Sequence, residues 1–246
     1  VQPRKLYHYA RALGARNKTD EIDAALLAGF GAERRPPPSV PASPAQRSIK
    51  HLTATRRAMV EQRVRCKNQI SALERLPVPE PACLRELKRN LANTERVIVR
   101  LEAARTRLIE AEYADEAALL ESIPGIGPQT TTALLGYAGD LSSFSSPRQL
   151  VALLGTAPRR ERSGTSLWVN GPITKQGNRT LRTLFFMGAQ TARKHNAACR
   201  ALYERLIARG KSKKQALIAV VNKLARQAWA VLHHRQPYVD GFGLSP

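Results

Sequence analysis

The chain has 246 residues and a formal net charge of +21, with 40 Lys and Arg against 19 Asp and Glu. A chain this basic attracts polyanions, so nucleic acid is the expected partner, although charge alone would also suit a binding protein without chemistry. Three widely spaced cysteines form no C-x-x-C pair, which excludes a disulfide framework and indicates reduced thiols. Because no apolar run could span a bilayer and no signal peptide opens the chain, we expect a cytoplasmic protein without membrane contact.

Residues 1–33 are expected to form a short lead-in segment and then a helix. The apolar positions with helical spacing are Ile22, Leu26, Leu27 and Phe30, and Thr19 or Asp20 is a suitable cap. This stretch is too short to bury a core alone, so we interpret it as the end of a larger domain. The chain begins at Val1 without a methionine, which favours a fragment or a processed product.

A proline-rich segment, residues 34–46, predicts an extended linker. The next domain, residues 47–116, contains two long helical patterns at 47–76 and 82–112, separated by "PVPEP". A heptad seam in the second pattern is formed by Leu84, Leu87, Leu91, Thr94, Ile98, Leu101, Arg105 and Leu108. The sequence therefore predicts an antiparallel coiled-coil hairpin.

Residues 117–246 are predicted to form a helical C-terminal domain, so the fold class is mainly α. "IPGIG" lies between two helical patterns, and Gly125 and Gly127 allow backbone geometry closed to other residues. This resembles a helix-hairpin-helix, which presents free N–H groups to a phosphate; a plain helical corner is the alternative. Further helices are expected after Pro147, at 179–208 and at 213–233, with Lys211, Lys213 and Lys214 clustered at the start of the last one.

The segment "KTDEIDA" offers a pair of carboxylates. Asp20 and Asp23 are three residues apart, so a helix places both on one side. Hard Mg²⁺ accepts such oxygens and keeps waters that phosphates can replace. Most such pairs, however, are solvated faces or caps, and the five histidines form no zinc set with the cysteines.

The polar run "RSGTS" contains Ser163 and Ser166. A serine hydroxyl needs activation to act as a nucleophile, and no histidine lies nearby in sequence. The cations that could hold a phosphodiester near it are Arg159, Arg160, Arg162, Lys175, Arg179 and Arg182. From spacing alone, a loop that binds phosphate is as good an interpretation as a nucleophile.

The order of these segments resembles one group of insertion-sequence transposases. They are "KTDEIDA", the proline linker, the hairpin, "SIPGIGPQTTTALL", "QLVALLG", "SG" and "ITKQGNRTLR". The group pairs a RuvC-like DEDD domain with a serine-containing transposase domain, and the pilin-inversion recombinase Piv is a relative. The resemblance covers nearly all of the chain and is most specific from Ser122 to Arg182.

The resemblance implies a DNA recombinase. It assigns Asp20 and Asp23 to the last two acids of an Mg²⁺-binding tetrad and Ser163 to the nucleophile, with Ser166 as the alternative. It places the first two acids upstream of this chain, so we expect an N-terminally truncated enzyme with a remnant of the RuvC-like α/β domain. It also implies a bridge RNA as guide, self-association and location at the bacterial nucleoid. The alternative function is a non-catalytic protein that grips the nucleic-acid backbone.

Overall fold

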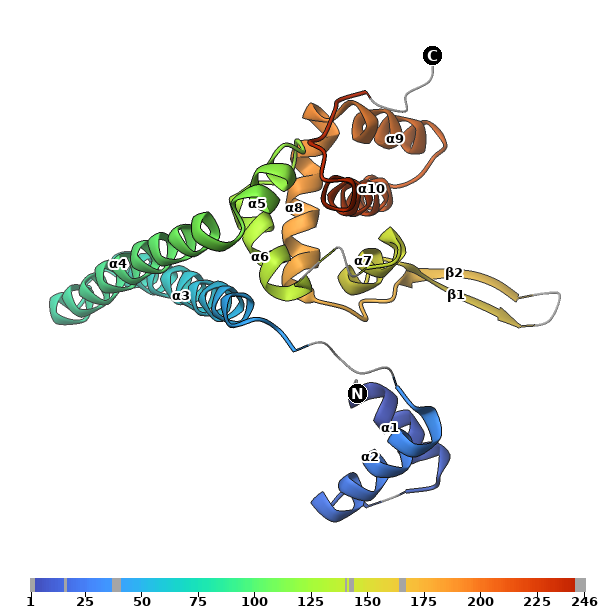
Figure 1. The fold of residues 1–246 in the computed structure, drawn as a ribbon. Helices are drawn as coiled ribbons and strands as arrows, with labels where there is room; N and C mark the ends of the chain where they lie inside the picture. The colour runs from blue at the N-terminus through green and yellow to red at the C-terminus, as the bar shows by residue number, and fades with distance from the viewer. Residues whose placement is uncertain are drawn as a thin grey trace. The chain divides into compact units, whose positions relative to one another are not determined.

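The computed structural model describes residues 3–15, 17–36, 41–139, 141, 144–163 and 167–241, with the side chains of 160–170 excepted. It divides into two compact units, Val1–Pro41 and Ala42–Pro246, and each is described by itself. Helices dominate both (Figure 1), so the mainly α class predicted from the sequence is confirmed.

The first unit holds helices α1 (Pro3–Ala12) and α2 (Asp20–Arg34). Thr19, one of the two predicted caps, begins α2, and its Oγ1 accepts the Ile22 N–H at 3.3 Å. Helix α1 was missed in the sequence, where this stretch was expected to be a lead-in segment. It is tied to α2 by Tyr9, whose ring meets Phe30 edge-on at 5.3 Å and whose hydroxyl donates to Glu33 at 2.8 Å. A contact across the two helices thus decides what the local pattern left open.

The second unit begins with two long antiparallel helices, α3 (Pro44–Glu74) and α4 (Pro81–Glu112). Ser43 caps α3 and Pro44 takes its first position, so the helix starts inside the predicted linker. The eight predicted seam positions of α4 are all buried or half-buried. The coiled-coil geometry itself stays a prediction.

The root of this hairpin packs on helix α6. Ile49 of α3 is fully buried, and a Cβ on Gly136 of α6 would lie 2.9 Å from its Cγ2 atom. Only a glycine therefore permits this close approach between the two helices.

The remaining helices form a bundle with one apolar core. Their bounds are α5 (Ala114–Glu121), α6 (Pro128–Ala138), α7 (Pro147–Leu154), α8 (Arg179–His195), α9 (Ala197–Ala208) and α10 (Lys213–His234). The residues that the sequence placed on one side of the last helix are all buried: Leu217, Val220, Val221, Leu224, Ala228 and Val231. Phe185 of α8 is the largest fully buried side chain among the described residues. Burial of these side chains supplies the main stabilisation of the bundle.

A buried asparagine divides the helix predicted over 179–208. Asn196 has an extended backbone, and its Oδ1 accepts the Cys199 N–H and the Tyr238 hydroxyl. Its amide donates to Gln227 of α10 at 3.1 Å. These long-range partners satisfy the buried amide, and they explain why local helical spacing did not reveal the break.

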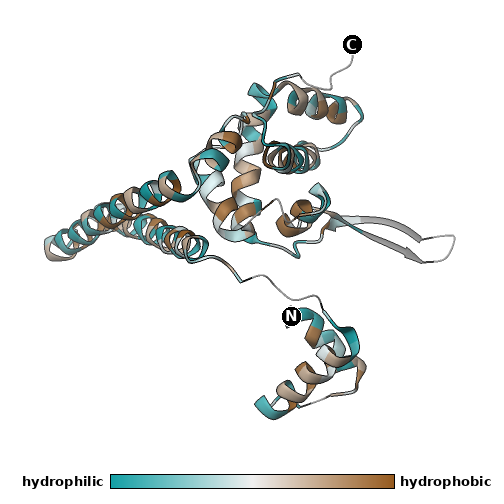
Figure 2. Ribbon diagram, in the orientation of Figure 1, coloured by the Kyte–Doolittle hydropathy of each residue, from teal (hydrophilic) through white to brown (hydrophobic). Residues whose placement is uncertain are grey.

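A two-stranded antiparallel hairpin interrupts the helices, formed by β1 (Pro158–Ser163) and β2 (Leu167–Ile173). A polar loop was expected here from the residue types. Among the described residues, the two strands form a two-stranded sheet of their own. Figure 2 shows hydrophilic and hydrophobic positions mixed along α3 and α4. None of the helices in the described ranges is long and apolar enough to cross a membrane.

Candidate nucleic-acid interface

Ser163 is the last residue of β1. Its backbone partner is Leu167 at the start of β2, and Arg162 and Arg160 pair with Trp168 and Asn170. The side chains of these residues lie outside the described part of the structure, as does the whole of Ser166. The backbone thus places the predicted nucleophile beside the tip of a hairpin, and not in the unpaired loop that the sequence suggested.

The base of the hairpin is held by the segment "ITKQGN". The Thr174 N–H donates to the Ala157 carbonyl at 2.9 Å, and the Lys175 N–H donates to the Gly155 carbonyl at 3.0 Å. Lys175 has a left-handed backbone with φ 54°, which turns the chain back toward α7. The chain direction at the hairpin base is therefore set by backbone hydrogen bonds.

The same segment closes the C-terminal end of α7. The Asn178 N–H donates to the Leu153 carbonyl at 2.7 Å, and a Cβ on Gly177 would lie 2.3 Å from that oxygen. Arg182, predicted to hold phosphate, donates from Nη1 to the Leu154 carbonyl at 2.9 Å. Carbonyls at a helix C-terminus need such donors. Arg182 thus has a structural partner in this fold, and Gly177 is required for close packing.

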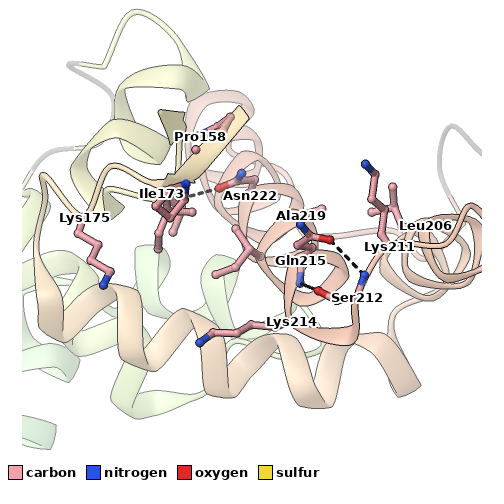
Figure 3. A pocket seen from close by; sticks show the side chains of 14 residues that line it. Pro158, Ile173, Lys175, Leu206, Lys211, Ser212, Lys214, Gln215, Ala219 and Asn222 are labelled. Carbon is pink, nitrogen blue, oxygen red and sulfur yellow. Dashed lines mark hydrogen bonds between the residues drawn. The ribbon is translucent and has the colours of Figure 1, made fainter. Parts of the chain in front are cut away.

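A cavity of about 660 Å³ lies beside the base of the β1–β2 hairpin (Figure 3). Its apolar lining includes Pro158 and Ile173 from the hairpin and Ile218 from α10. Three lysines line it as well: Lys175, Lys211 and Lys214. Three ammonium groups on one cavity favour an anionic partner, such as the phosphates of a nucleic acid.

Helix α10 forms one wall of this cavity. Its first turn has a capping box, in which the Ser212 Oγ accepts the Gln215 N–H and the Gln215 Oε1 accepts the Ser212 N–H. Farther along, Asn222 accepts the buried Thr156 hydroxyl, which joins α10 to the hairpin base. The cavity wall is thereby fixed by polar contacts at both ends.

The "IPGIG" turn joins α5 to α6. Gly125 has φ 109°, and a Cβ there would lie 2.8 Å from both the Gly188 carbonyl and the Ala192 Cβ of α8. Gly127 is different, because its φ of −117° suits any residue and open space surrounds its Cβ position. The expectation that both glycines supply special geometry is therefore wrong for Gly127. Gly125 is needed for packing on α8.

Gly127 nevertheless begins α6 without a side-chain hydrogen bond to cap it. Arg179 is the first residue of α8 and is exposed, and Arg159 is exposed on β1. These positions leave positive potential at two helix starts and along the hairpin base, as a phosphate-binding surface requires.

Asp20 and Asp23 lie in the first turn of α2, in the first unit, whereas Ser163 belongs to the second. Their spacing puts both carboxylates on one side of the helix, with Asp20 exposed and Asp23 half-buried. In the described ranges, no group of three or more His, Cys, Asp or Glu residues could hold a metal ion. The two acids fit a Mg²⁺ ion that takes its other oxygens from water, phosphate or further acids.

Comparison with known proteins identifies the family. The model of the transposase family IS116/IS110/IS902 matches residues 117–204, and the DEDD transposase model of IS110 matches residues 1–76. The two matches together include the acidic pair, the "IPGIG" turn, the β1–β2 hairpin and the first part of α9.

Individual relatives agree with these matches. The pilin gene-inverting protein of Moraxella bovis is 34% identical over 245 residues, which cover 97% of this chain and 73% of the relative. The transposase for insertion sequence element IS1328 of Yersinia enterocolitica is 30% identical, over 91% of this chain and 74% of the relative. The chain belongs to the IS110-type transposase family, which includes the pilin gene-inverting proteins.

Proposed function

We propose that this chain acts as a DNA transposase or site-specific recombinase that uses Ser163 as its nucleophile. The observation that carries the proposal is the place of Ser163 in the fold. Ser163 ends strand β1, whose base is fixed by the "ITKQGN" segment, and that base, five residues before Ser163, lines a cavity with three lysines. Family membership, with relatives named for transposition and gene inversion, supports DNA as the substrate.

The chemistry would have two balanced steps. In the first, the Ser163 Oγ bonds to the phosphorus of a phosphodiester and loses its proton to a base, while the deoxyribose oxygen leaves and takes up a proton. In the second step, a deoxyribose hydroxyl of another strand attacks the phosphorus of the phosphoserine. A new phosphodiester forms, and the Ser163 oxygen leaves and takes up a proton. Lys175 and Arg159, at the hairpin base, would bind neighbouring phosphates of the same DNA, because four strand residues separate Arg159 from Ser163 by roughly 13 Å. Arg160 and Arg162 are proposed to assist them.

Asp20 and Asp23 are proposed as Mg²⁺ ligands. When bound, Mg²⁺ would neutralise phosphate charge and orient the reacting group. In this chain, the two acids alone should bind Mg²⁺ weakly, because a site with few carboxylates has low affinity for the ion. Calorimetry should show a dissociation constant of roughly millimolar or higher. A tight stoichiometric site that Asp20→Asn abolishes would contradict this expectation.

The test of the nucleophile is covalent trapping. Labelled target DNA is incubated with Mg²⁺ and the protein, both as it stands and with an N-terminal segment that carries two further acids, and is run on a denaturing gel. Ser163→Ala should abolish the protein–DNA adduct, while DNA affinity changes by no more than about tenfold, because one neutral hydrogen bond contributes about 1 kcal/mol.

Ser166→Ala is the matched control, because it removes a hydroxyl three residues away. If Ser166→Ala abolishes the adduct and Ser163→Ala does not, Ser166 is the nucleophile. If DNA is cut without an adduct in either variant, a water is the nucleophile. If DNA binds but is never cut, the alternative of a non-catalytic binding protein is correct.

A guide RNA and self-association are further proposals, supported by the family resemblance. Adding and omitting a bridge RNA in the same assay tests the first. Light scattering with and without DNA tests the second.

A further inference from the structure

A second cavity, about 370 Å³, lies where the root of the α3–α4 hairpin meets the first turns of α6 and α8. Thr53, Arg56 and Arg57 line it from α3, Gln129 from α6, and Arg179 and Thr180 from α8. Arg179 is the one residue of this set that was predicted from the sequence to bind phosphate. The packing of α3 on the bundle brings the other five residues to the cavity.

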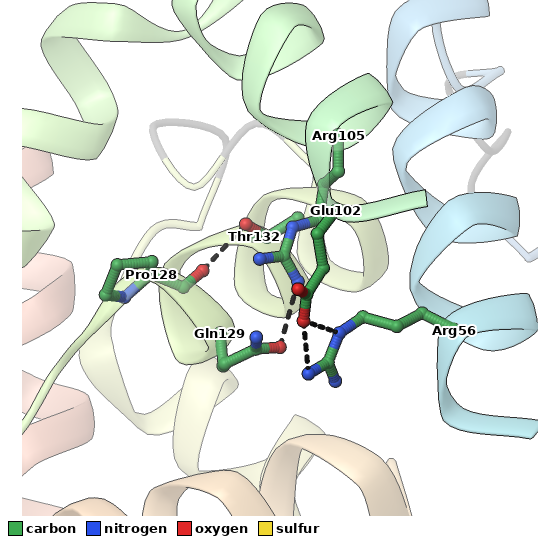
Figure 4. A network of polar contacts seen from close by, with 6 residues as sticks. All are labelled: Arg56, Glu102, Arg105, Pro128, Gln129 and Thr132. Atoms are coloured by element: carbon green, nitrogen blue, oxygen red, sulfur yellow. Dashed lines mark hydrogen bonds and ion pairs between the residues drawn. The ribbon is translucent and has the colours of Figure 1, made fainter. Parts of the chain in front are cut away.

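Guanidinium groups outnumber carboxylates around this cavity. Arg56 binds Glu102 of α4 through two contacts, at 2.6 and 2.7 Å (Figure 4). Arg57 pairs with Glu61 at 3.3 Å and donates to the Thr180 hydroxyl. With the exposed Arg179, three guanidinium groups line the cavity, against the lining carboxylate of Glu61 and the Glu102 carboxylate that pairs with Arg56. The excess favours an anion in the cavity.

Arg105 shows how crowded the positive charges are. Its side chain is only 6% exposed and donates to the Gln129 Oε1 at 2.9 Å. Burial lowers the pKa of Arg105 and the neighbouring Arg56 lowers it further, and the Glu102 and Glu121 carboxylates offset only part of this decrease. An anion bound beside Gln129 would relieve this repulsion.

Two helix starts add to the positive potential. Gln129 belongs to the first turn of α6, which has no side-chain cap, and Arg179 and Thr180 open α8. The N-terminal turn of a helix favours a phosphate group. Here two such turns meet on one cavity.

An unpartnered hydroxyl completes the set. Thr53 is 9% exposed and lines the cavity, and its Oγ1 has no hydrogen-bond partner among the described residues. A buried hydroxyl without a partner is unfavourable in the free protein. A ligand oxygen would supply the missing partner.

We propose that this cavity binds a backbone phosphate of duplex DNA and so holds the hairpin root on the DNA. The choice of DNA rests on the proposed function, whereas the choice of phosphate rests on the cavity itself. The site contains none of the residues proposed above for strand cleavage, although Arg179 was among the cations predicted from the sequence to hold phosphate.

The first test is DNA binding by fluorescence anisotropy in EDTA, over a range of salt concentrations. Arg179→Gln should weaken binding for all sequences and reduce the salt-dependence slope by about one, the value for one lost phosphate contact. Arg89→Gln is the charge-matched control, because Arg89 is exposed on α4 at least ~20 Å along the helix from Arg105. Arg89→Gln should reduce the salt-dependence slope of DNA binding less than Arg179→Gln does.

The second test uses two threonines with buried, unpartnered hydroxyls. Thr53→Val should lower DNA affinity about fivefold, the effect of one hydrogen bond, without lowering the melting temperature of the free protein. Thr131→Val is the control, because Thr131 is equally unpartnered but does not line the cavity. It should leave affinity unchanged.

Three outcomes would overturn the proposal. They are unchanged DNA binding in both Arg179→Gln and Thr53→Val, equal losses in Thr53→Val and Thr131→Val, or losses seen with RNA of the same length and not with DNA. Cleavage is absent from these measurements, so a failure of the serine mechanism would leave their result intact.

Discussion

The α3–α4 hairpin and the α5–α10 bundle are both helical but are stabilised in different ways. Helices α3 and α4, of 31 and 32 residues, bury four and three residues, whereas α10 buries nine of its 22. Polar contacts and ion pairs cross the hairpin instead, among them Lys67–Glu95 at 3.4 Å and Lys88–Glu74 at 2.8 Å. The bundle is therefore stabilised by a core of its own. The α3–α4 hairpin has few buried residues and is stabilised mainly where its root packs on the bundle.

This difference indicates different tasks. Exposed ion pairs contribute little to stability, so the many charges of the hairpin are poorly explained by folding alone. They are better explained by an anionic partner, which the cavity at the hairpin root is also suited to bind. The bundle, in contrast, gives the β1–β2 hairpin a rigid base.

The largest effect is expected at the contact between the "IPGIG" turn and α8. A Cβ on Gly188 would lie 2.2 Å from the Gly125 carbonyl, so Gly188→Ala must displace backbone. We expect it to reduce the free energy of unfolding by about 3 kcal/mol, as overpacking against a rigid neighbour does. Urea denaturation measures the loss.

Gly127→Ala is the control for that prediction. Its backbone is ordinary and its Cβ position is open, so the loss should stay below about 1 kcal/mol, within the range for a changed N-cap. Equal losses for the two variants would show that the turn does not depend on its contact with α8.

The cysteines allow the hairpin and the bundle to be compared in one experiment. Cys83 is exposed, Cys66 is 3% exposed in the hairpin, and Cys199 is fully buried in the bundle. Burial raises the pKa of the Cys199 thiol to about 12, so it stays protonated and unreactive at neutral pH. A thiol reagent followed by mass spectrometry should label Cys83 first, Cys66 next and Cys199 last.

Cys66 should become reactive through local opening of the hairpin, at least about tenfold faster than Cys199, because local opening needs less free energy than global unfolding. Low concentrations of urea should change the labelling rate of Cys66 little. The labelling rate of Cys199 should rise strongly only near the urea concentration of global unfolding. Identical labelling rates for both thiols would mean that hairpin and bundle unfold as one unit.

Arg105 tests how polar contacts hold the hairpin root. Arg105→Ala should cost about 1–2 kcal/mol of unfolding free energy, from the lost packing of its stem and the lost hydrogen bond to Gln129. Arg105→Met keeps most of the volume without the desolvated charge, so it should cost less than about 1 kcal/mol. Thermal denaturation of both variants separates volume from charge, and a larger loss for Met than for Ala would contradict this account.

The smallest effect is expected for the exposed ion pairs. Lys67→Gln should change the free energy of unfolding by less than about 0.5 kcal/mol, because solvent screens the Lys67–Glu95 pair. A double-mutant cycle with Glu95→Gln measures the coupling directly. A coupling above about 1 kcal/mol would show that ion pairs stabilise the hairpin more than exposed pairs usually do.

The helices were predictable to the extent that their patterns were local. The seam of α4 and the apolar side of α10 repeat every three or four residues, so spacing alone located them. The β1–β2 hairpin and the break at Asn196 were missed, because strand pairing and the partners of a buried amide come from residues far apart in sequence.

The candidate site divides in the same way. The sequence located the acidic pair, the Ser163 segment and the basic positions, since residue type and short spacing define them. It assigned Arg182 to phosphate, whereas the structure gives it the Leu154 carbonyl, and it treated the two glycines of "IPGIG" alike. Those distinctions depend on which helix lies opposite.

By itself the sequence determined the strong positive charge, the helical class and the positions of most helices, because composition, spacing and caps act within a few turns of chain. Tertiary structure alone decided that Gly125 and Gly188 meet, that "ITKQGN" closes α7, and that three arginines and three threonines from α3 and α8 line one cavity. The physical reason is that close packing joins surfaces of helices whose partners no local pattern names.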